Sequence, residues 1–106
     1  MEIIEIIGQE EFDQVLKSNK IVVADFYATW CAPCKLQTPI IHELNLDVKD
    51  KVLIVKIDVD QNEKTAFKYG VESIPTIIVF KDGNSIEKSV GLTTKAKLSE
   101  MLIKHL

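Results

Sequence analysis

Two nearly continuous apolar runs, IVVADFY at 21–27 and VLIVKID at 52–58, constrain the fold of this chain more than any other feature. Both runs have the length of a strand, and a strand with apolar residues at successive positions is covered on both of its faces. A helical segment at 34–48 lies between them, and its apolar stripe is expected to consist of Leu36, Ile40, Ile41 and Leu44. The runs therefore predict the centre of an α/β protein whose sheet carries helices on both faces.

The remaining segments predict short strands and helices that alternate along the chain. Strands are expected at 2–7, 75–80 and 85–90, and helices at 10–18, at 63–70 and from Thr93 or Thr94 to 106. The turn KDGN at 81–84 makes the last two strands a hairpin. Strands joined through helices are expected to be parallel, and hairpin strands antiparallel. The result is a mixed sheet of five strands with four helices, and the length of 106 residues predicts a single domain spanning 1–106.

Charge and hydropathy exclude several classes of partner. The 13 basic and 16 acidic residues give a net charge of −3 without a basic stripe, so neither nucleic acid nor a membrane surface is indicated. The N-terminal stretch is acidic where a secretory signal is basic, and no run approaches the roughly 20 apolar residues of a membrane span. We expect a cytoplasmic protein, although a chain whose signal had been removed would have the same pattern. We also expect a monomer.

The motif WCAPC at 30–34 contains both cysteines of the chain. A disulfide between Cys31 and Cys34 would close too short a loop to stabilise the fold much. In a reducing compartment, cysteines this close in sequence more often indicate metal or redox chemistry. Structural zinc needs two further ligands, and His42 and His105 lack cysteine or acidic neighbours at ligand spacing. We therefore favour a redox pair over a metal site, which would require dimerisation.

The position of the motif distinguishes the two cysteines. Cys31 follows the strand that ends at Tyr27 and begins the next helix. Unpaired N–H groups and the helix dipole favour a thiolate there, and the thiolate is the attacking species in disulfide exchange. Cys34 lies one turn further into the helix. We therefore predict that Cys31 is the exposed attacking group and Cys34 the less exposed resolving thiol, with Pro33 stiffening the first turn.

An acidic residue, Asp25, interrupts the first apolar run. An uncompensated carboxylate in a buried strand is costly, and desolvation should raise its pKa. Asp25 could then accept a proton from Cys34, through water. Lys56 lies in the adjoining strand, on the face of Val52 and Ile54, from which it could reach Asp25. The alternative is a structural buried pair without a role in catalysis.

The stretches DFYATWCAPCK, VKIDVDQN, YGVESIPTIIVF, KDG and VGLTTKAKL, in this order, resemble the thioredoxin family over essentially the whole chain. A C-x-x-C motif near a βαβ pattern is itself a sign of this family. The resemblance implies a three-layer α/β/α thioredoxin fold with three parallel-type strands and a C-terminal antiparallel hairpin. It also implies a general protein-disulfide reductase in which Cys31 is the nucleophile and Cys34 the resolving thiol.

The resemblance assigns further roles to residues of this chain. It places the family's buried acid at Asp25, its nearby lysine at Lys56 and its cis-proline at Pro75. It places the substrate groove at Trp30, Ala32, Pro33, Ile74, Pro75, Val90 and Gly91. A cis bond would turn the Ile74 backbone outward beside Cys31, where an extended substrate could pair with it. The implied partners are disulfide-containing proteins and a flavin-dependent thioredoxin reductase that passes on electrons from NADPH, or another reductase, with no cofactor bound to the chain itself.

Some residues depart from the family pattern. Ala32 replaces the usual glycine, Tyr27 a common second tryptophan, and Glu72–Ser73 a frequent basic residue and glycine. Oxidases and isomerases of this kind commonly carry histidine between the cysteines, whereas Ala32–Pro33 carries no charge, so reduction is favoured. A glutaredoxin-type role is disfavoured because no cationic pair lies near the motif. A non-catalytic interaction subunit of the same fold remains an alternative.

Overall fold

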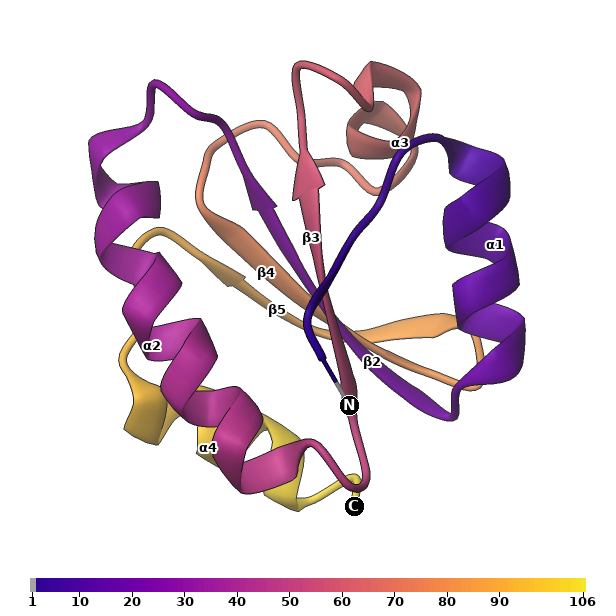
Figure 1. Ribbon diagram of the computed structural model, residues 1–106, viewed down its shortest axis with the longest axis vertical. Coiled ribbons are helices and arrows are strands. Elements are labelled where there is room, and N and C mark those ends of the chain that lie inside the picture. Colours follow the sequence, from indigo (N-terminus) through magenta and orange to yellow (C-terminus); the bar gives the residue numbers. More distant parts are fainter. Residues whose placement is uncertain (1) are drawn as a thin grey trace.

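A central five-stranded sheet with helices on both faces forms the core of the protein in a computed structural model that describes residues 2–106 (Figure 1). Met1, the first residue of the expected domain, lies outside the described residues. The elements are β1 (Ile4–Glu5), α1 (Gln9–Ser18), β2 (Ile21–Tyr27), α2 (Ala32–Val48), β3 (Leu53–Asp58), α3 (Glu63–Lys68), β4 (Thr76–Lys81), β5 (Asn84–Val90) and α4 (Lys95–Ile103). The strand order β1-β3-β2-β4-β5 places the two apolar runs, β2 and β3, side by side inside the sheet.

The strand directions confirm a mixed sheet with three parallel strands and a C-terminal hairpin. Strands β1, β3 and β2 run parallel, and β4 runs antiparallel to both β2 and β5. The expectation that helix-joined strands are parallel is wrong for β3 and β4. The six residues of α3 span only about 9 Å, too short to carry the chain back along a strand of about 20 Å. Strand β4 therefore begins at the same end of the sheet at which β3 finishes, and it runs in the opposite direction.

Two apolar layers explain the continuous runs in the sequence. On one face, side chains from α1 and α3, including Phe12 and Ala66, pack with Val22, Ala24 and Phe26. On the other face, α2 and α4 pack against the sheet. Their buried apolar side chains there are Ile41, Leu44, Leu98, Met101 and Leu102. Because β2 is covered by both layers, every residue from Ile21 to Phe26 is buried. Asp25 is thereby placed inside the protein.

The buried face of α2 differs from the apolar stripe that the sequence predicted. The helix begins at Ala32, two residues before the segment that apolar spacing predicted, and Cys31 is its N-cap, in line with the predicted place of Cys31 at the helix start. The stripe was expected to include Leu36, which is 61% exposed, while Gln37 is fully buried. The buried positions follow Cys34 at helical spacing, so the buried face is rotated by one residue toward a polar side chain. Periodicity alone could not reveal this, because a glutamine does not count as apolar.

Two other predicted boundaries are refined by the structure. Strand β1 has two residues instead of the six expected at 2–7, and it lies at the edge of the sheet. At the last helix, Thr94 and not Thr93 is the N-cap, because the Thr94 side chain accepts a hydrogen bond from the Lys97 N–H. Thr93 is thus left outside both β5 and α4.

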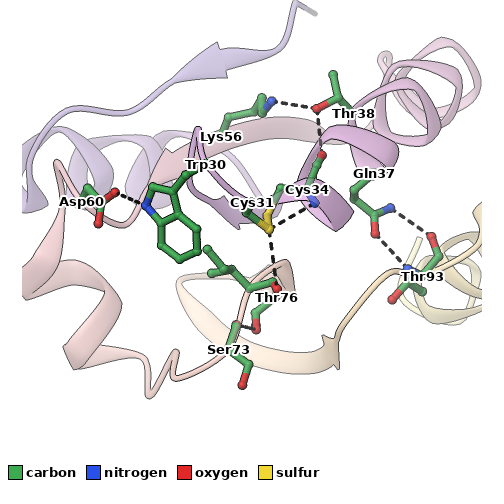
Figure 2. Close-up of a disulfide and its surroundings, with 11 residues drawn as sticks. Trp30, Cys31, Cys34, Gln37, Thr38, Lys56, Asp60, Ser73, Thr76 and Thr93 are labelled. Atoms are coloured by element: carbon green, nitrogen blue, oxygen red, sulfur yellow. Dashed lines mark hydrogen bonds between the residues drawn. A yellow bond between two sulfur atoms is a disulfide. The ribbon is translucent and has the colours of Figure 1, made fainter.

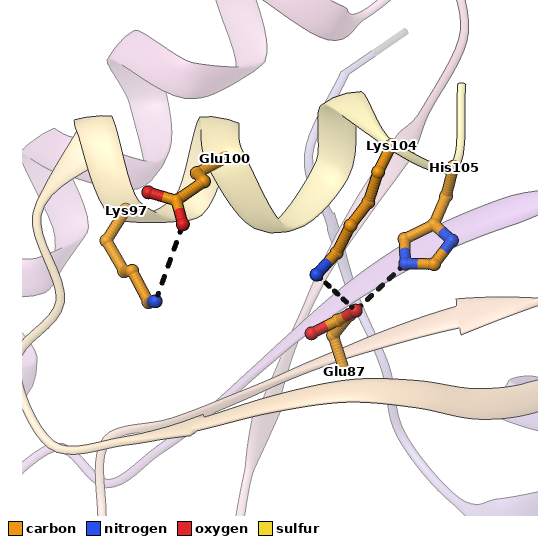
Figure 3. A network of polar contacts seen from close by, with 5 residues as sticks. All are labelled: Glu87, Lys97, Glu100, Lys104 and His105. Carbon is orange, nitrogen blue, oxygen red and sulfur yellow. Dashed lines mark hydrogen bonds and ion pairs between the residues drawn. The ribbon is translucent and has the colours of Figure 1, made fainter.

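The C-terminal end of α4 is tied to the sheet by Glu87 of β5 (Figure 3). The Glu87 carboxylate lies 3.1 Å from Lys104 Nζ and 2.9 Å from His105 Nε2. Hydrogen bonds from His105 and Lys104 lower the pKa of Glu87. The pair Lys97–Glu100, at 3.9 Å, is exposed on the same helix. His105, to which the sequence assigned no role, thus helps to anchor the chain end.

Candidate redox site

The two cysteines are joined by a disulfide where β2 passes into α2 (Figure 2). Their Cα atoms are 5.2 Å apart. Cys31 is the N-cap of α2, and the Cys34 backbone N–H donates a hydrogen bond to Cys31 Sγ at 3.2 Å. An N–H group that points at this sulfur, together with the positive end of the helix dipole, stabilises negative charge on Cys31 once the pair is reduced.

The prediction that Cys31 is exposed is wrong for the disulfide form, in which both cysteines are buried. Cys31 is 5% exposed and Cys34 is 3% exposed, because both belong to a buried cluster with Ala28 against which Tyr27, Val59 and Ile74 pack. The asymmetry lies instead in the surroundings of the two sulfur atoms. Cys31 receives the N–H bond at the helix start, while Cys34 lies inside the first turn.

The Ile74–Pro75 peptide bond is cis, as the family resemblance implied. It brings the Ile74 carbonyl oxygen to 3.8 Å from Cys31 Sγ. The Pro75 carbonyl accepts a hydrogen bond of 2.8 Å from the Gly91 N–H. The chain segments of three predicted groove residues thus meet beside the disulfide.

The other predicted groove residues surround this centre at the surface. Trp30 is 69% exposed, and its Nε1 donates to Asp60 Oδ2 at 2.8 Å (Figure 2). Val90 is exposed and lies opposite Thr76 in the β4–β5 pair. Ala32 and Pro33 are exposed in the first turn of α2. The sequence did not single out Asp60, because an exposed acid in a loop carries no signal that distinguishes it from its neighbours.

Asp25 lies in β2, in the middle of the sheet, where β3 and β4 flank it on either side. It is 1% exposed, and neither of its carboxyl oxygens has a hydrogen-bond partner. Desolvation raises the pKa of Asp25 from 3.8 to about 6, against the opposing effect of Lys56 and with a smaller contribution from Glu5 in the same direction as burial. The raised pKa predicted from the sequence is confirmed, while the role of Asp25 as a proton acceptor stays a prediction.

Lys56 faces Asp25 across the β2–β3 pair, yet its ammonium group is held elsewhere. Lys56 Nζ donates to Thr38 Oγ1 at 3.2 Å and lies 4.3 Å from the centre of the Tyr27 ring. The Thr38 hydroxyl donates in turn to the Cys34 carbonyl at 3.2 Å. Lys56 therefore acts on Asp25 through space and not through a hydrogen bond. Sequence reasoning missed Thr38, because a single threonine in a helix carries no periodic signal.

Replacing Lys56 by methionine is expected to raise the pKa of Asp25 above its value of about 6. The substitution removes the nearby positive charge that favours the ionised carboxylate, and it keeps the length of the side chain. Carbon-13 NMR titration of the Asp25 carboxyl in both proteins would measure the change. An unchanged titration would show that the Asp25 carboxyl does not sense the Lys56 charge.

Within residues 2–106, no three His, Cys, Asp or Glu side chains are arranged so that they could hold a metal ion. Across the same residues, the structure contains no helix that is both long enough and apolar enough to cross a membrane.

A disulfide within one helical turn, with one sulfur at the helix start, is suited to exchange with other disulfides through mixed-disulfide intermediates. Fold and site together define a thiol–disulfide oxidoreductase. The family model described as thioredoxin matches residues 3–104. The chain belongs to the thioredoxin family, and it is a protein-disulfide oxidoreductase of the thioredoxin type, a dithiol–disulfide reductase with Cys31 and Cys34 as its redox centre.

Individual relatives agree with this assignment over nearly the full chain. The chain is 54% identical over 89 residues to thioredoxin of Bacillus subtilis (strain 168), covering 84% of this chain and 86% of the relative. It is 50% identical over 96 residues to thioredoxin of Staphylococcus aureus (strain N315), covering 91% of each. Among solved structures, Fasciola hepatica thioredoxin has a TM-score of 0.91 at 32% identity, covering 98% of this chain and all of that one. The reduced thioredoxin pre-protein of Schistosoma mansoni has a TM-score of 0.89 at 39% identity, covering 100% of both chains.

Proposed function

We propose that the protein reduces disulfides in a range of other proteins, with Cys31 as the attacking thiolate and Cys34 as the resolving thiol. Cys31 attacks one sulfur of the substrate disulfide, the substrate S–S bond breaks, and the other substrate sulfur leaves as a thiolate that takes up a proton. Cys34 then loses its proton and attacks Cys31 Sγ in the mixed disulfide. The substrate leaves with two thiols, and the protein is left with its Cys31–Cys34 disulfide.

The hydrogen bond from the Cys34 N–H to Cys31 Sγ is the observation that carries this assignment. It places a donor on Cys31 at the start of a 17-residue helix, where a thiolate is favoured. No such bond to the sulfur of Cys34 is found among the described residues. The local electrostatics therefore favour charge on Cys31 over charge on Cys34.

Asp25 is proposed as the proton acceptor for Cys34, with Lys56 tuning its charge. With a pKa of about 6, the Asp25 carboxyl is mostly ionised at neutral pH, so it is able to accept a proton. Its pKa is also close enough to neutral pH for the carboxyl to hold the proton during the transfer. The transfer would pass through water, since Asp25 has no hydrogen-bond partner of its own. A small pocket lined in part by Cys34, Thr38 and Lys56 would admit this water beside Cys34.

The substrate would bind across the surface formed by Trp30, Ala32, Pro33, Ile74, Pro75, Val90 and Gly91. The Ile74 carbonyl lies beside Cys31 Sγ, which suits an extended segment that pairs with this backbone. Glu72 and Ser73, next to Ile74, would make this edge more acidic than a basic residue would. We expect clients with a basic residue near the disulfide to be favoured.

The oxidised pair is proposed to be reduced again by a flavin-dependent thioredoxin reductase, with electrons from NADPH, or by another reductase. The chain itself would hold no cofactor in this cycle. The proposed location is the cytoplasm, because a dithiol reductase needs a compartment in which thiols are kept reduced.

The reduction potential tests the reductase assignment. The Cys31–Cys34 pair is equilibrated against glutathione and dithiothreitol, and the fluorescence of Trp30 reports the fraction that is reduced. The reduction potential is expected to lie near the roughly −270 mV typical of thioredoxin. Ala32 and Pro33, between the cysteines, are both uncharged. They therefore supply no positive charge that would stabilise the reduced form and make the pair more oxidising. A strongly oxidising value, near about −120 mV, would instead identify an oxidase.

A further inference from the structure

Gln37 is a buried glutamine whose whole side-chain amide bonds to the backbone of one residue. It is 0% exposed and lies one helical turn after Cys34. Its Nε2 donates to the Thr93 carbonyl at 2.9 Å, and its Oε1 accepts from the Thr93 N–H at 2.8 Å (Figure 2). This two-bond contact, here called the Gln37–Thr93 clasp, joins the redox helix to the loop between β5 and α4.

The loop that the clasp holds is part of the proposed substrate surface. The Thr93 hydroxyl donates to the Gly91 carbonyl at 2.9 Å and also contacts the Ser89 hydroxyl. The Gly91 N–H donates to the Pro75 carbonyl at 2.8 Å, beside Cys31. A continuous series of hydrogen bonds thus runs from α2, through Thr93 and Gly91, to the cis-proline.

A polar side chain at this position needs a specific reason. Burial of an amide is costly unless its hydrogen bonds are made, and an apolar residue of similar size would fill the same space without this cost. Thr93 is itself buried and lies outside both β5 and α4, so no regular hydrogen bonding pairs its N–H and carbonyl groups. Gln37 supplies both partners at once.

We propose that Gln37 is a positioning residue for protein substrates, which acts by fixing the Val90–Gly91 edge of the groove relative to Cys31. The inference rests on the proposed function and adds a determinant of its preference for protein disulfides. A small disulfide reaches Cys31 without contacts along the groove, so its reduction does not depend on the clasp. An extended segment needs both the Ile74 and the Gly91 side of the groove in place.

Gln37→Met tests the proposal, because methionine keeps the length of the side chain and removes both hydrogen bonds. The KM for insulin, a protein disulfide, is expected to rise on the order of tenfold, the effect of about one to two lost hydrogen bonds. The rate with the small disulfide 5,5′-dithiobis(2-nitrobenzoic acid) and the reduction potential are expected to stay unchanged. Ile41→Val, on the same buried face of α2, is the matched control; it loosens the core without touching the clasp. Ile41→Val should leave unchanged both the KM for insulin and the rate with the small disulfide.

Amide hydrogen exchange gives a second readout on the same variants. The Thr93 and Gly91 amides are expected to exchange faster in folded Gln37→Met, while the amides of β2 keep their protection. If Gln37→Met fails to fold, Gln37→Glu carries the test. A protonated glutamic acid can donate to the Thr93 carbonyl, whereas the ionised form cannot. Its KM defect on insulin, relative to the wild-type protein at the same pH, is therefore expected to shrink as the pH is lowered.

Equal losses on insulin and on the small disulfide would overturn the proposal, because they would place the effect of Gln37 at the redox centre or in global stability. Unchanged kinetics with both substrates, or a Gln37→Glu defect that does not vary with pH, would also overturn it. Failure of the proposed function itself would be recognised separately, since the wild-type protein would then not reduce insulin.

Discussion

Cys34→Ser is expected to accumulate covalent mixed disulfides with substrate proteins, whereas Cys31→Ser is expected to capture almost none. Cys31 lies at the helix start and receives the Cys34 N–H bond, so Cys31 alone is activated to open a substrate disulfide. Cys34 is needed only to release the product. Denaturing gels run without reductant should show the trapped species for Cys34→Ser, and treatment with dithiothreitol should remove them. Reductase turnover should be lost in both variants.

The pattern of trapping separates the alternatives. Equal capture by the two variants, or capture by Cys31→Ser alone, would show that the assignment of attacker and resolver is wrong. Capture by neither variant, with binding of partners retained, would favour a non-catalytic interaction subunit. The double variant with serine at both positions is the matched control, because it keeps the surface and removes both sulfur atoms.

The fold could be predicted from the sequence to the extent that apolar spacing determines it. The runs at 21–27 and 52–58 predicted adjacent buried strands, because residues covered on both faces must be apolar at successive positions. The direction of β4 could not be read in this way. It depends on the length of α3 relative to the strands, which the spacing of apolar residues does not report.

The redox site was predictable where chemistry is carried by unusual residues in fixed positions. Two cysteines at a helix start and an acid inside an apolar strand are visible in the sequence alone. The supporting polar contacts are not visible, because Gln37 and Thr38 acquire their roles only when a distant loop and strand β3 are brought to α2. The register placed Lys56 opposite Asp25, but the hydrogen bond with Thr38 decides where its ammonium group lies.

Asp25→Asn is expected to stabilise the protein at pH 7 and to lose this advantage near pH 4. The folded-state pKa of Asp25, about 6, lies above its ordinary value of 3.8, so the folded protein binds the proton more tightly than the unfolded chain. The contribution of Asp25 to the unfolding free energy therefore falls as the pH rises between these two values and stays low above them. The difference between 3.8 and about 6 corresponds to about 3 kcal/mol.

Urea unfolding of both proteins at pH 7 and at pH 4 would measure this effect. At pH 4 most of the Asp25 carboxyl is protonated in the folded protein, so that measurement isolates the cost of the asparagine amide from the cost of the charge. The stability gain at pH 7 should exceed the gain at pH 4 by about 2 to 3 kcal/mol. Equal differences at the two pH values would show that the Asp25 pKa is not raised by burial.

The same substitution is expected to slow the reduction of a protein disulfide at neutral pH, because an asparagine amide cannot accept the proton of Cys34. Stability and turnover should therefore change in opposite directions in one variant, which a purely structural carboxyl would not produce. Turnover measured from about pH 6 to about pH 9 covers the titrations involved. A more stable variant with unchanged turnover over this range would limit Asp25 to a buried charge that costs stability and serves no step of the exchange.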